Sequence, residues 1–97
     1  MQFEWDAAKN QANIHKHGFD FNDAWQIFGG PMAVALDDRH DYGEARWIGI
    51  GFLQNRIVVV VFSDRDEDTI RIISLRKALT HECDHYEQFL KDRLDQG

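Results

Sequence analysis

Two histidines and a glutamate near the end of the chain have the spacing of a zinc-binding helix. The stretch His81-Glu82-Cys83-Asp84-His85 fits the H-E-x-x-H pattern, in which histidines one helical turn apart hold the metal and the glutamate acts as base. A catalytic zinc site needs a third protein ligand, and the twelve residues after His85 contain no glycine-and-histidine continuation. A zinc hydrolase is therefore one hypothesis. A solvated polar face on an amphipathic helix, with no metal, is the preferred interpretation.

The chain of 97 residues carries a formal net charge of −6 and one cysteine. Such a charge opposes sequence-independent binding to nucleic acid, so any contact with RNA or DNA must depend on a local patch of arginine and lysine. The single cysteine suits a reducing compartment. No apolar run approaches the ~18 residues of a membrane helix, and the first residues lack an apolar signal segment. We therefore expect a cytoplasmic protein without membrane contact.

The hydrophobic pattern predicts two helices, four strands and a final helix, in that order. The first helix should begin after Asp6 and end at Gly18, and the second should begin after Asp20 and pair with the first as a hairpin. A long final helix should start at about Lys77. Strands are predicted at residues 32–37, 46–53, 56–63 and 70–76, and turns at Gln54-Asn55 and at residues 64–69. The fold class is therefore α+β, with a four-stranded antiparallel sheet in one domain spanning residues 1–97.

Side-chain periodicity predicts which residues face the core. In the strand at residues 70–76, alternation places Arg71, Ile73 and Leu75 together on one face. Trp5 and Trp25 are expected in the core, because aromatic residues on short helices that cover a sheet are usually buried. The final helix should pack on the sheet through a stripe formed by Leu79, Cys83, Tyr86, Leu90 and Leu94.

Five segments, in register along the chain, resemble one family of bacterial proteins. They are F3-E-W-D6 followed by Lys9, N13-I-H-K-H-G18, F21-N-D-A24, G43-E-A-R46 and R71-I-I-S-L-R-K-A78. Glu82 and Tyr86 continue the pattern into the final helix. Together these segments resemble the BrnT toxins of type II toxin–antitoxin systems.

The resemblance implies a compact RelE/ParE-like fold and a ribonuclease that cuts RNA without a metal or other cofactor. Such a toxin inhibits translation and growth. The resemblance also implies a partner, a BrnA-like ribbon-helix-helix antitoxin, whose complex with the toxin binds operator DNA. A catalytically degenerate toxin, which only binds its antitoxin and operator, remains an alternative because this chain is acidic and its final helix is poor in arginine.

RNA cleavage without a metal uses the neighbouring 2′-hydroxyl as nucleophile. It needs a base for that proton, cations beside the phosphorane and an acid for the leaving 5′-oxygen. Arginine suits the cationic role because it stays charged and offers a forked donor geometry to phosphate. We expect Arg65 and Arg71 to hold or stabilise the phosphate. Further contacts to RNA are expected from Lys16, Arg46, Arg76 and Lys77.

For Arg71 and Arg76 a structural ion pair with Glu44, Asp64 or Glu82 is the alternative. Three residues are candidates for the catalytic group that moves a proton: His17, Glu44 and Tyr86. The pKa of a histidine suits proton transfer near neutrality. Two of the three also have structural interpretations, since His17 can bond to the last carbonyls of its helix and Tyr86 can pack with its hydroxyl at the core edge.

Overall fold

The fold is described from a computed structural model, which describes residues 1–39, 41 and 43–95. Its helical segments are α1 (Ala7–His17), the 3-10 turn η1 (Phe21–Asp23), α2 (Trp25–Phe28) and α3 (Thr80–Asp95). Its strands are β1 (Gln2–Glu4), β2 (Ala33–Leu36), β3 (Trp47–Leu53), β4 (Arg56–Asp66) and β5 (Thr69–Lys77). Within this described part, no helix is long and apolar enough to cross a membrane.

The sheet has one more strand than predicted. Its order is β1-β5-β4-β3-β2, and the four strands from β2 to β5 pair antiparallel, as expected. The additional strand β1 pairs parallel with β5, with Glu4 beside Arg71. The sheet is therefore mixed, and the prediction of a purely antiparallel four-stranded sheet was wrong in this respect. Three residues are too few to show a strand periodicity in the sequence.

Both predicted hairpin turns are present. Gln54 and Asn55 have φ angles of 51° and 68°, which are the left-handed angles that a tight two-residue hairpin requires. The second turn is shorter than residues 64–69, because β4 continues to Asp66 and β5 begins at Thr69.

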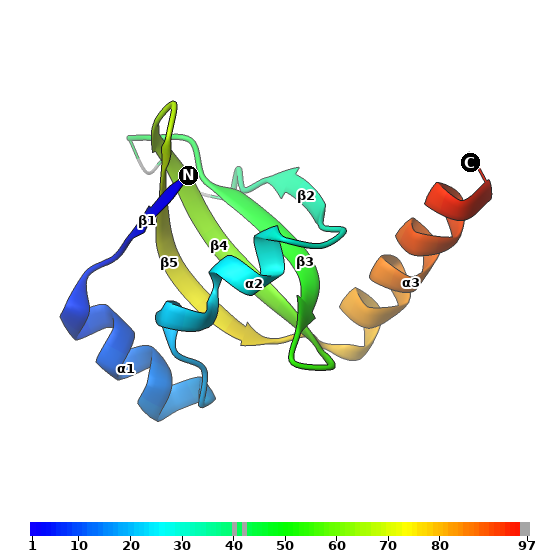
Figure 1. The fold of residues 1–97 in the computed structure, drawn as a ribbon, viewed down its shortest axis with the longest axis horizontal. Coiled ribbons are helices and arrows are strands. Elements are labelled where there is room, and N and C mark those ends of the chain that lie inside the picture. Colours follow the sequence, from blue (N-terminus) through cyan, green and yellow to red (C-terminus); the bar gives the residue numbers. More distant parts are fainter. Residues whose placement is uncertain (40, 42, 96–97) are drawn as a thin grey trace.

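Helical segments pack on both faces of the sheet, with η1 and α2 on one face and α3 over part of the other (Figure 1). On one face, η1 and α2 bury Phe21 and Ile27 against β3, β4 and β5. On the other face, α3 buries Tyr86 against Val59 of the central strand β4. Burial on both faces explains why β4 reads as a continuous run of valines. The chain packs closely here: a Cβ added to Gly51 would lie 2.8 Å from Cγ2 of Ile27.

A β-bulge in β5 changes which side chains share a face. Val61 lies opposite Ser74 while Phe62 lies opposite Ile72, so Ile73 is the extra residue. Leu75 consequently joins Ile72 in the core under η1 and α2. The prediction that Arg71, Ile73 and Leu75 share one face was therefore wrong.

The same register brings two arginines onto one face. Arg71 lies opposite Ser63 and Arg76 opposite Val59. Ser63 and Val59 are four residues apart on β4, so they point to the same side of the sheet. Because Val59 packs in the cluster that contains Tyr86, both arginines lie on the α3 side.

Helix α1 begins and ends at the predicted residues, and it is hydrogen-bonded to the backbone of β5. Asp6 accepts a hydrogen bond from the backbone N–H of Lys9 at 3.0 Å, and Gly18 ends the helix at φ 78°. The amide of Asn13 donates to the Leu75 carbonyl at 2.9 Å and accepts from the Leu75 N–H at 3.2 Å. In place of the predicted helical hairpin, α1 packs against β5 and the short helix α2 packs against β3.

Candidate functional site

A row of five polar residues crosses the α3 side of the sheet, one from each strand or its immediate extension. Glu4 pairs with Arg71, and Arg71 with Ser63. Trp47 pairs with Phe62, so the preceding residue Arg46 lies beside Ser63. At the far end, the Asp37 N–H donates to the Arg46 carbonyl at 2.7 Å. We call these residues the polar row: Asp37, Arg46, Ser63, Arg71 and Glu4.

The carboxylate of Glu4 is shared by two arginines. Nη1 of Arg71 donates to Oε2 of Glu4 at 2.7 Å, and Nε of Arg65 lies 3.7 Å from the same oxygen. The side chains remain accessible, with exposed fractions of 51% for Arg65 and 30% for Arg71. Two guanidinium groups therefore share one hydrogen-bonded or ion-paired carboxylate, and the exposed carboxylates of Asp6 and Asp66 lie near enough to interact with Arg71 and Arg65.

The middle of the polar row holds a buried hydroxyl. The side chain of Ser63 is fully buried, and within the described residues its Oγ makes no hydrogen bond. Beyond Arg46, the buried carboxylate of Asp37 accepts two hydrogen bonds from the Arg39 guanidinium, at 2.8 and 2.9 Å, and one from the Arg39 backbone N–H, at 3.3 Å. The row thus combines guanidinium, hydroxyl and carboxylate groups on one surface.

Arg76 is placed differently, in an ion pair with a carboxylate of its own. Its two terminal nitrogens donate to the two oxygens of Glu82 at 2.8 and 2.9 Å. Glu82 also accepts from the Leu79 N–H at the start of α3, at 2.8 Å. The Arg76 guanidinium holds the pKa of the Glu82 carboxyl well down, at about 2. This is the structural ion pair that the sequence left open for Arg76.

The candidates at the end of α1 lie beside Arg76 rather than beside Arg71. Burial lowers the pKa of His17, and the charges of Lys16 and Arg76 lower it further. The imidazole is therefore neutral near pH 7. The β4 partners of Arg76 and Arg71 are four residues apart, so the two arginines are separated by about 13 Å along the strand direction. Lys77 ends β5 as an exposed residue next to Arg76 in sequence.

The other two proton-transfer candidates differ in exposure. Glu44 is an exposed residue of the segment that precedes β3. Tyr86 is fully buried in α3, where its hydroxyl donates to the Pro31 carbonyl at 2.8 Å. Its ring packs against Phe52 and Phe89, and burial raises the pKa of its hydroxyl. The structure thus gives Tyr86 the packing role that was its alternative interpretation.

The H-E-x-x-H stretch offers no zinc site in the described part of the chain. His81 and His85 are exposed on α3, whereas Glu82 is held by Arg76. Among the described residues, no group of three or more histidine, cysteine or acidic side chains is arranged to hold a metal.

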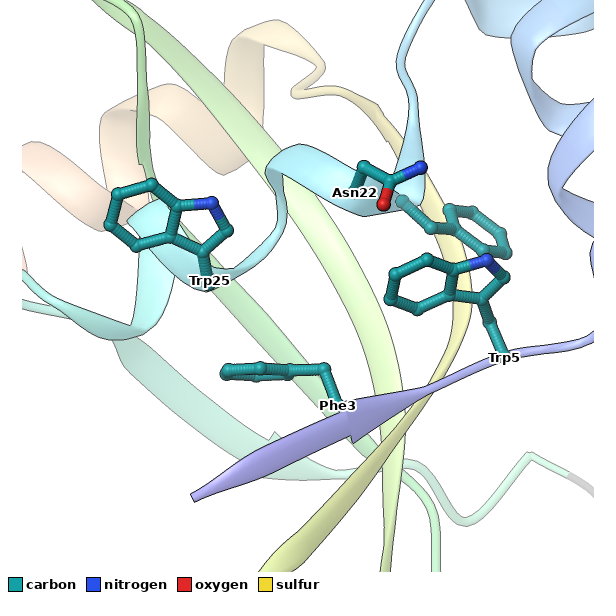
Figure 2. A pocket seen from close by; sticks show the side chains of 5 residues that line it. Phe3, Trp5, Asn22 and Trp25 are labelled. Atoms are coloured by element: carbon teal, nitrogen blue, oxygen red, sulfur yellow. The ribbon is translucent and has the colours of Figure 1, made fainter.

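Two cavities lie apart from the arginines of the polar row. One, of about 250 Å³, lies between β1 and the segment η1–α2 (Figure 2) and is lined by Phe3, Trp5, Phe21, Asn22 and Trp25. The other, of about 300 Å³, lies between α3 and the strands β2 and β3, where His85 and Phe89 face Ile48 and Ile50. Trp25 is 59% exposed, so the prediction that it belongs to the core was wrong. Trp5 is partly buried and packs against the core.

Glu4 is the residue that sequence reasoning missed. A glutamate two residues into an unrecognised strand gives no signal by itself, because its partner Arg71 is 67 residues away in the chain. Only the pairing of β1 with β5 brings the two together.

Comparison with known proteins gives a consistent result. A family model described as "Ribonuclease toxin, BrnT, of type II toxin-antitoxin system" matches residues 5–82. The crystal structure of the Brucella abortus ribonuclease toxin BrnT is similar, with a TM-score of 0.64 and 29% sequence identity, over 82% of this chain and 99% of that one. Among curated proteins, no significant match is found. Since the family model covers most of the sequence, this chain belongs to the BrnT family of ribonuclease toxins of type II toxin–antitoxin systems.

Proposed function

We propose that this chain is an active endoribonuclease that cuts RNA without a metal, and thereby inhibits translation and growth. The observation that carries the proposal is the shared carboxylate: Arg65 and Arg71 both face Glu4 on an accessible face of the sheet. A bridging phosphodiester can bind there by displacing the exposed Glu4 carboxylate from the two guanidinium groups. Arg46 lies on the same face, two strands from Arg71, and extends the positive surface.

In the proposed reaction, the phosphate competes with Glu4 for the guanidinium of Arg71. A Glu4 carboxylate displaced from Arg71 lies next to the substrate, so it can accept the proton of the 2′-hydroxyl. The 2′-oxygen then bonds to phosphorus and the bond to the 5′-oxygen breaks. The products are a 2′,3′-cyclic phosphate and a 5′-hydroxyl, whose proton comes from solvent. Arg65 and Arg71 stabilise the charge that grows on the phosphorane oxygens.

The remaining candidates receive lesser roles in this proposal. Lys16, His17 and Lys77 lie near the other end of β5, and we assign them contacts with the RNA backbone away from the cleaved bond, whereas Arg76 is held by Glu82 and is assigned a structural role. Glu44 remains a second candidate for the base. Tyr86 holds α3 on the sheet.

The test is cleavage of an end-labelled RNA by the purified chain in the presence of a metal chelator. We expect cleavage products that end in a cyclic phosphate, and loss of cleavage in Arg71→Ala and Glu4→Gln. A chain that folds but leaves RNA intact under these conditions would contradict the proposed activity, and would favour the degenerate toxin that acts only as a binding module.

We also propose that a BrnA-like ribbon-helix-helix antitoxin neutralises this toxin in the cytoplasm, and that their complex binds operator DNA. A family of type II toxins implies an antitoxin partner. Because the chain has a net charge of −6, the contacts to operator phosphates should come from the antitoxin. The RelE/ParE-like relationship of the fold likewise remains a proposal. Co-expression with a ribbon-helix-helix protein encoded beside the toxin should restore growth, and should yield a complex that shifts the operator fragment.

A further inference from the structure

The cavity beside β1 is lined by two tryptophan side chains from different segments. Figure 2 shows Trp25, from α2, on one side and Trp5, from the segment after β1, on the other, with Phe3 between them and Asn22 beside Trp5. Trp5 is fixed by an edge-on contact with Phe21, at 6.5 Å between ring centroids. The volume of about 250 Å³ is slightly smaller than that of a typical pocket for a drug-sized ligand, so it suits a single flat ring system.

The indole of Trp25 lies outside the core. The side chain is 59% exposed, whereas Ala24 and Ile27 on either side of it are buried in the core. An exposed indole contributes little to folding, but its ring face is available to stack on another aromatic system. The amide of Asn22 adds a polar group at the rim: its nitrogen donates to Asp20 at 3.0 Å, and within the described residues its oxygen makes no hydrogen bond. That oxygen can accept from an exocyclic amine.

The cavity adjoins the arginine site around the edge of the sheet. Trp5 lies between Glu4, which contacts Arg71 at 2.7 Å, and Asp6. The backbone N–H of Lys9 lowers the pKa of Asp6, and the charge of Arg71 contributes to this shift, so Arg71 is close to both neighbours of Trp5. Since β1 is an edge strand, its two faces are connected around an open edge. A single strand of RNA can pass this edge with a phosphate at Arg71 and a base on the opposite face.

We propose that the cavity between Trp5 and Trp25 binds one unpaired nucleobase of the RNA substrate, next to the nucleotide whose phosphate is held by Arg65 and Arg71. This inference rests on the proposed ribonuclease function and adds a base-binding subsite to it. Stacking on an indole ring accepts every base, and the Asn22 oxygen favours bases that carry an exocyclic amine, which are adenine, cytosine and guanine.

The experiment measures binding without cleavage. The probe is a dye-labelled single-stranded hexamer of adenylate with 2′-O-methyl riboses, which cannot be cut because the nucleophile is blocked. We expect Trp25→Ala to weaken binding of this probe about fivefold to hundredfold, and Trp25→Phe to retain most of the affinity, because base–aromatic stacking has this magnitude. Binding should also quench the tryptophan emission of the wild-type chain.

Salt dependence separates the base subsite from the phosphate site. Stacking releases no counterions, so Trp25→Ala should lower affinity equally at every salt concentration, whereas Arg71→Ala should reduce the slope of log K against log salt by about one. Leu36→Ala is the matched control: Leu36 is 53% exposed, lies on the opposite edge strand, and its loss should leave probe binding unchanged.

Two results would overturn the subsite. One is a Trp25→Ala chain that binds the probe as tightly as the wild type, which would assign the cavity to a protein partner instead. The other is a wild-type chain that does not bind the probe. Cleavage of ordinary RNA is scored separately: intact cleavage by a Trp25→Ala chain with unchanged probe affinity removes the subsite and keeps the ribonuclease. If the chain does not cleave RNA but its probe binding depends on Trp25, the subsite is kept and the ribonuclease is removed.

Discussion

Two arginine–glutamate pairs on the same face of the sheet differ in stoichiometry and in the exposure of the glutamate, whereas Arg71 and Arg76 are equally exposed, at 30% and 31%. At α3, Arg76 has the whole of Glu82, whose side chain is 15% exposed and also accepts from a backbone N–H. At β1, Arg71 shares Glu4 with Arg65, and the Glu4 side chain is 39% exposed. A saturated and partly buried pair holds structure together, whereas an unsaturated and exposed one can exchange its carboxylate for a ligand. Arginines that lie on one face of the sheet can therefore have different roles, one structural and one in ligand binding.

The largest expected effect is on catalysis at the exposed pair. Arg71→Ala should lower kcat/KM for RNA cleavage by about 10²–10³, because it removes a donor that stabilises the phosphorane charge. Its free energy of unfolding should change by less than about 1 kcal/mol, as is usual for an exposed ion pair. Cleavage kinetics and urea unfolding of the same preparation measure both. A variant that loses stability but keeps its activity would reverse the roles assigned to the two pairs.

The next effect is on stability at the saturated pair. Glu82→Gln should lower the free energy of unfolding by about 2–3 kcal/mol, because it leaves the Arg76 charge without a counterion and weakens the hydrogen bonds that Glu82 makes. For a chain of 97 residues this corresponds to a fall in Tm on the order of 10–20 °C. RNA cleavage, measured well below the reduced Tm, should remain close to wild type.

The pH dependence of the saturated pair has a defined sign. The folded-state pKa of Glu82 is about 2, below its ordinary value of 4.5, so folding favours the ionised carboxylate. The contribution to stability is complete above pH ~4.5 and is lost as the pH falls toward 2. The difference in unfolding free energy between the wild type and Glu82→Gln should therefore be constant from pH 7 to about 5 and shrink below. A difference that stays unchanged at pH 2.5 would contradict this assignment.

The smallest expected effect on stability sharpens the comparison. Glu4→Gln keeps the shape of the side chain and removes its charge, so the free energy of unfolding should change by less than about 1 kcal/mol while cleavage is lost. Thermal unfolding with the cleavage assay checks both. A large loss of stability would place Glu4 with Glu82 as a structural residue.

Local signals in the sequence predicted local structure well. The capping residues Asp6 and Gly18, the Gln54–Asn55 turn and the valine-rich strand β4 are all confirmed, because each depends on backbone preferences or periodicity over a few residues. The parallel strand β1 and the bulge at Ile73 were missed. Both depend on pairing with distant segments, which periodicity does not report.

The candidate site, too, was predicted from the sequence only in part. Residue chemistry singled out Arg65 and Arg71 from the sequence, and the structure brings both to one carboxylate. The identity of that carboxylate could not be predicted, since Glu4 contacts Arg71 through strand pairing across most of the chain. The exposure of Trp25 could not be predicted either, because α2 is a single helical turn that buries Ile27 and leaves the adjacent indole outside.

The pairing of β1 with β5 also bears on how the chain is made. Glu4 and Arg71 are 67 positions apart, so the ribosome must synthesise all the residues between them before their contact can form. Nascent fragments and prematurely terminated products that stop before Thr69 contain the acidic half of this contact without the strand that supplies its cationic half. A cell translating this gene would therefore meet the assembled arginine surface only on chains that extend beyond Arg71.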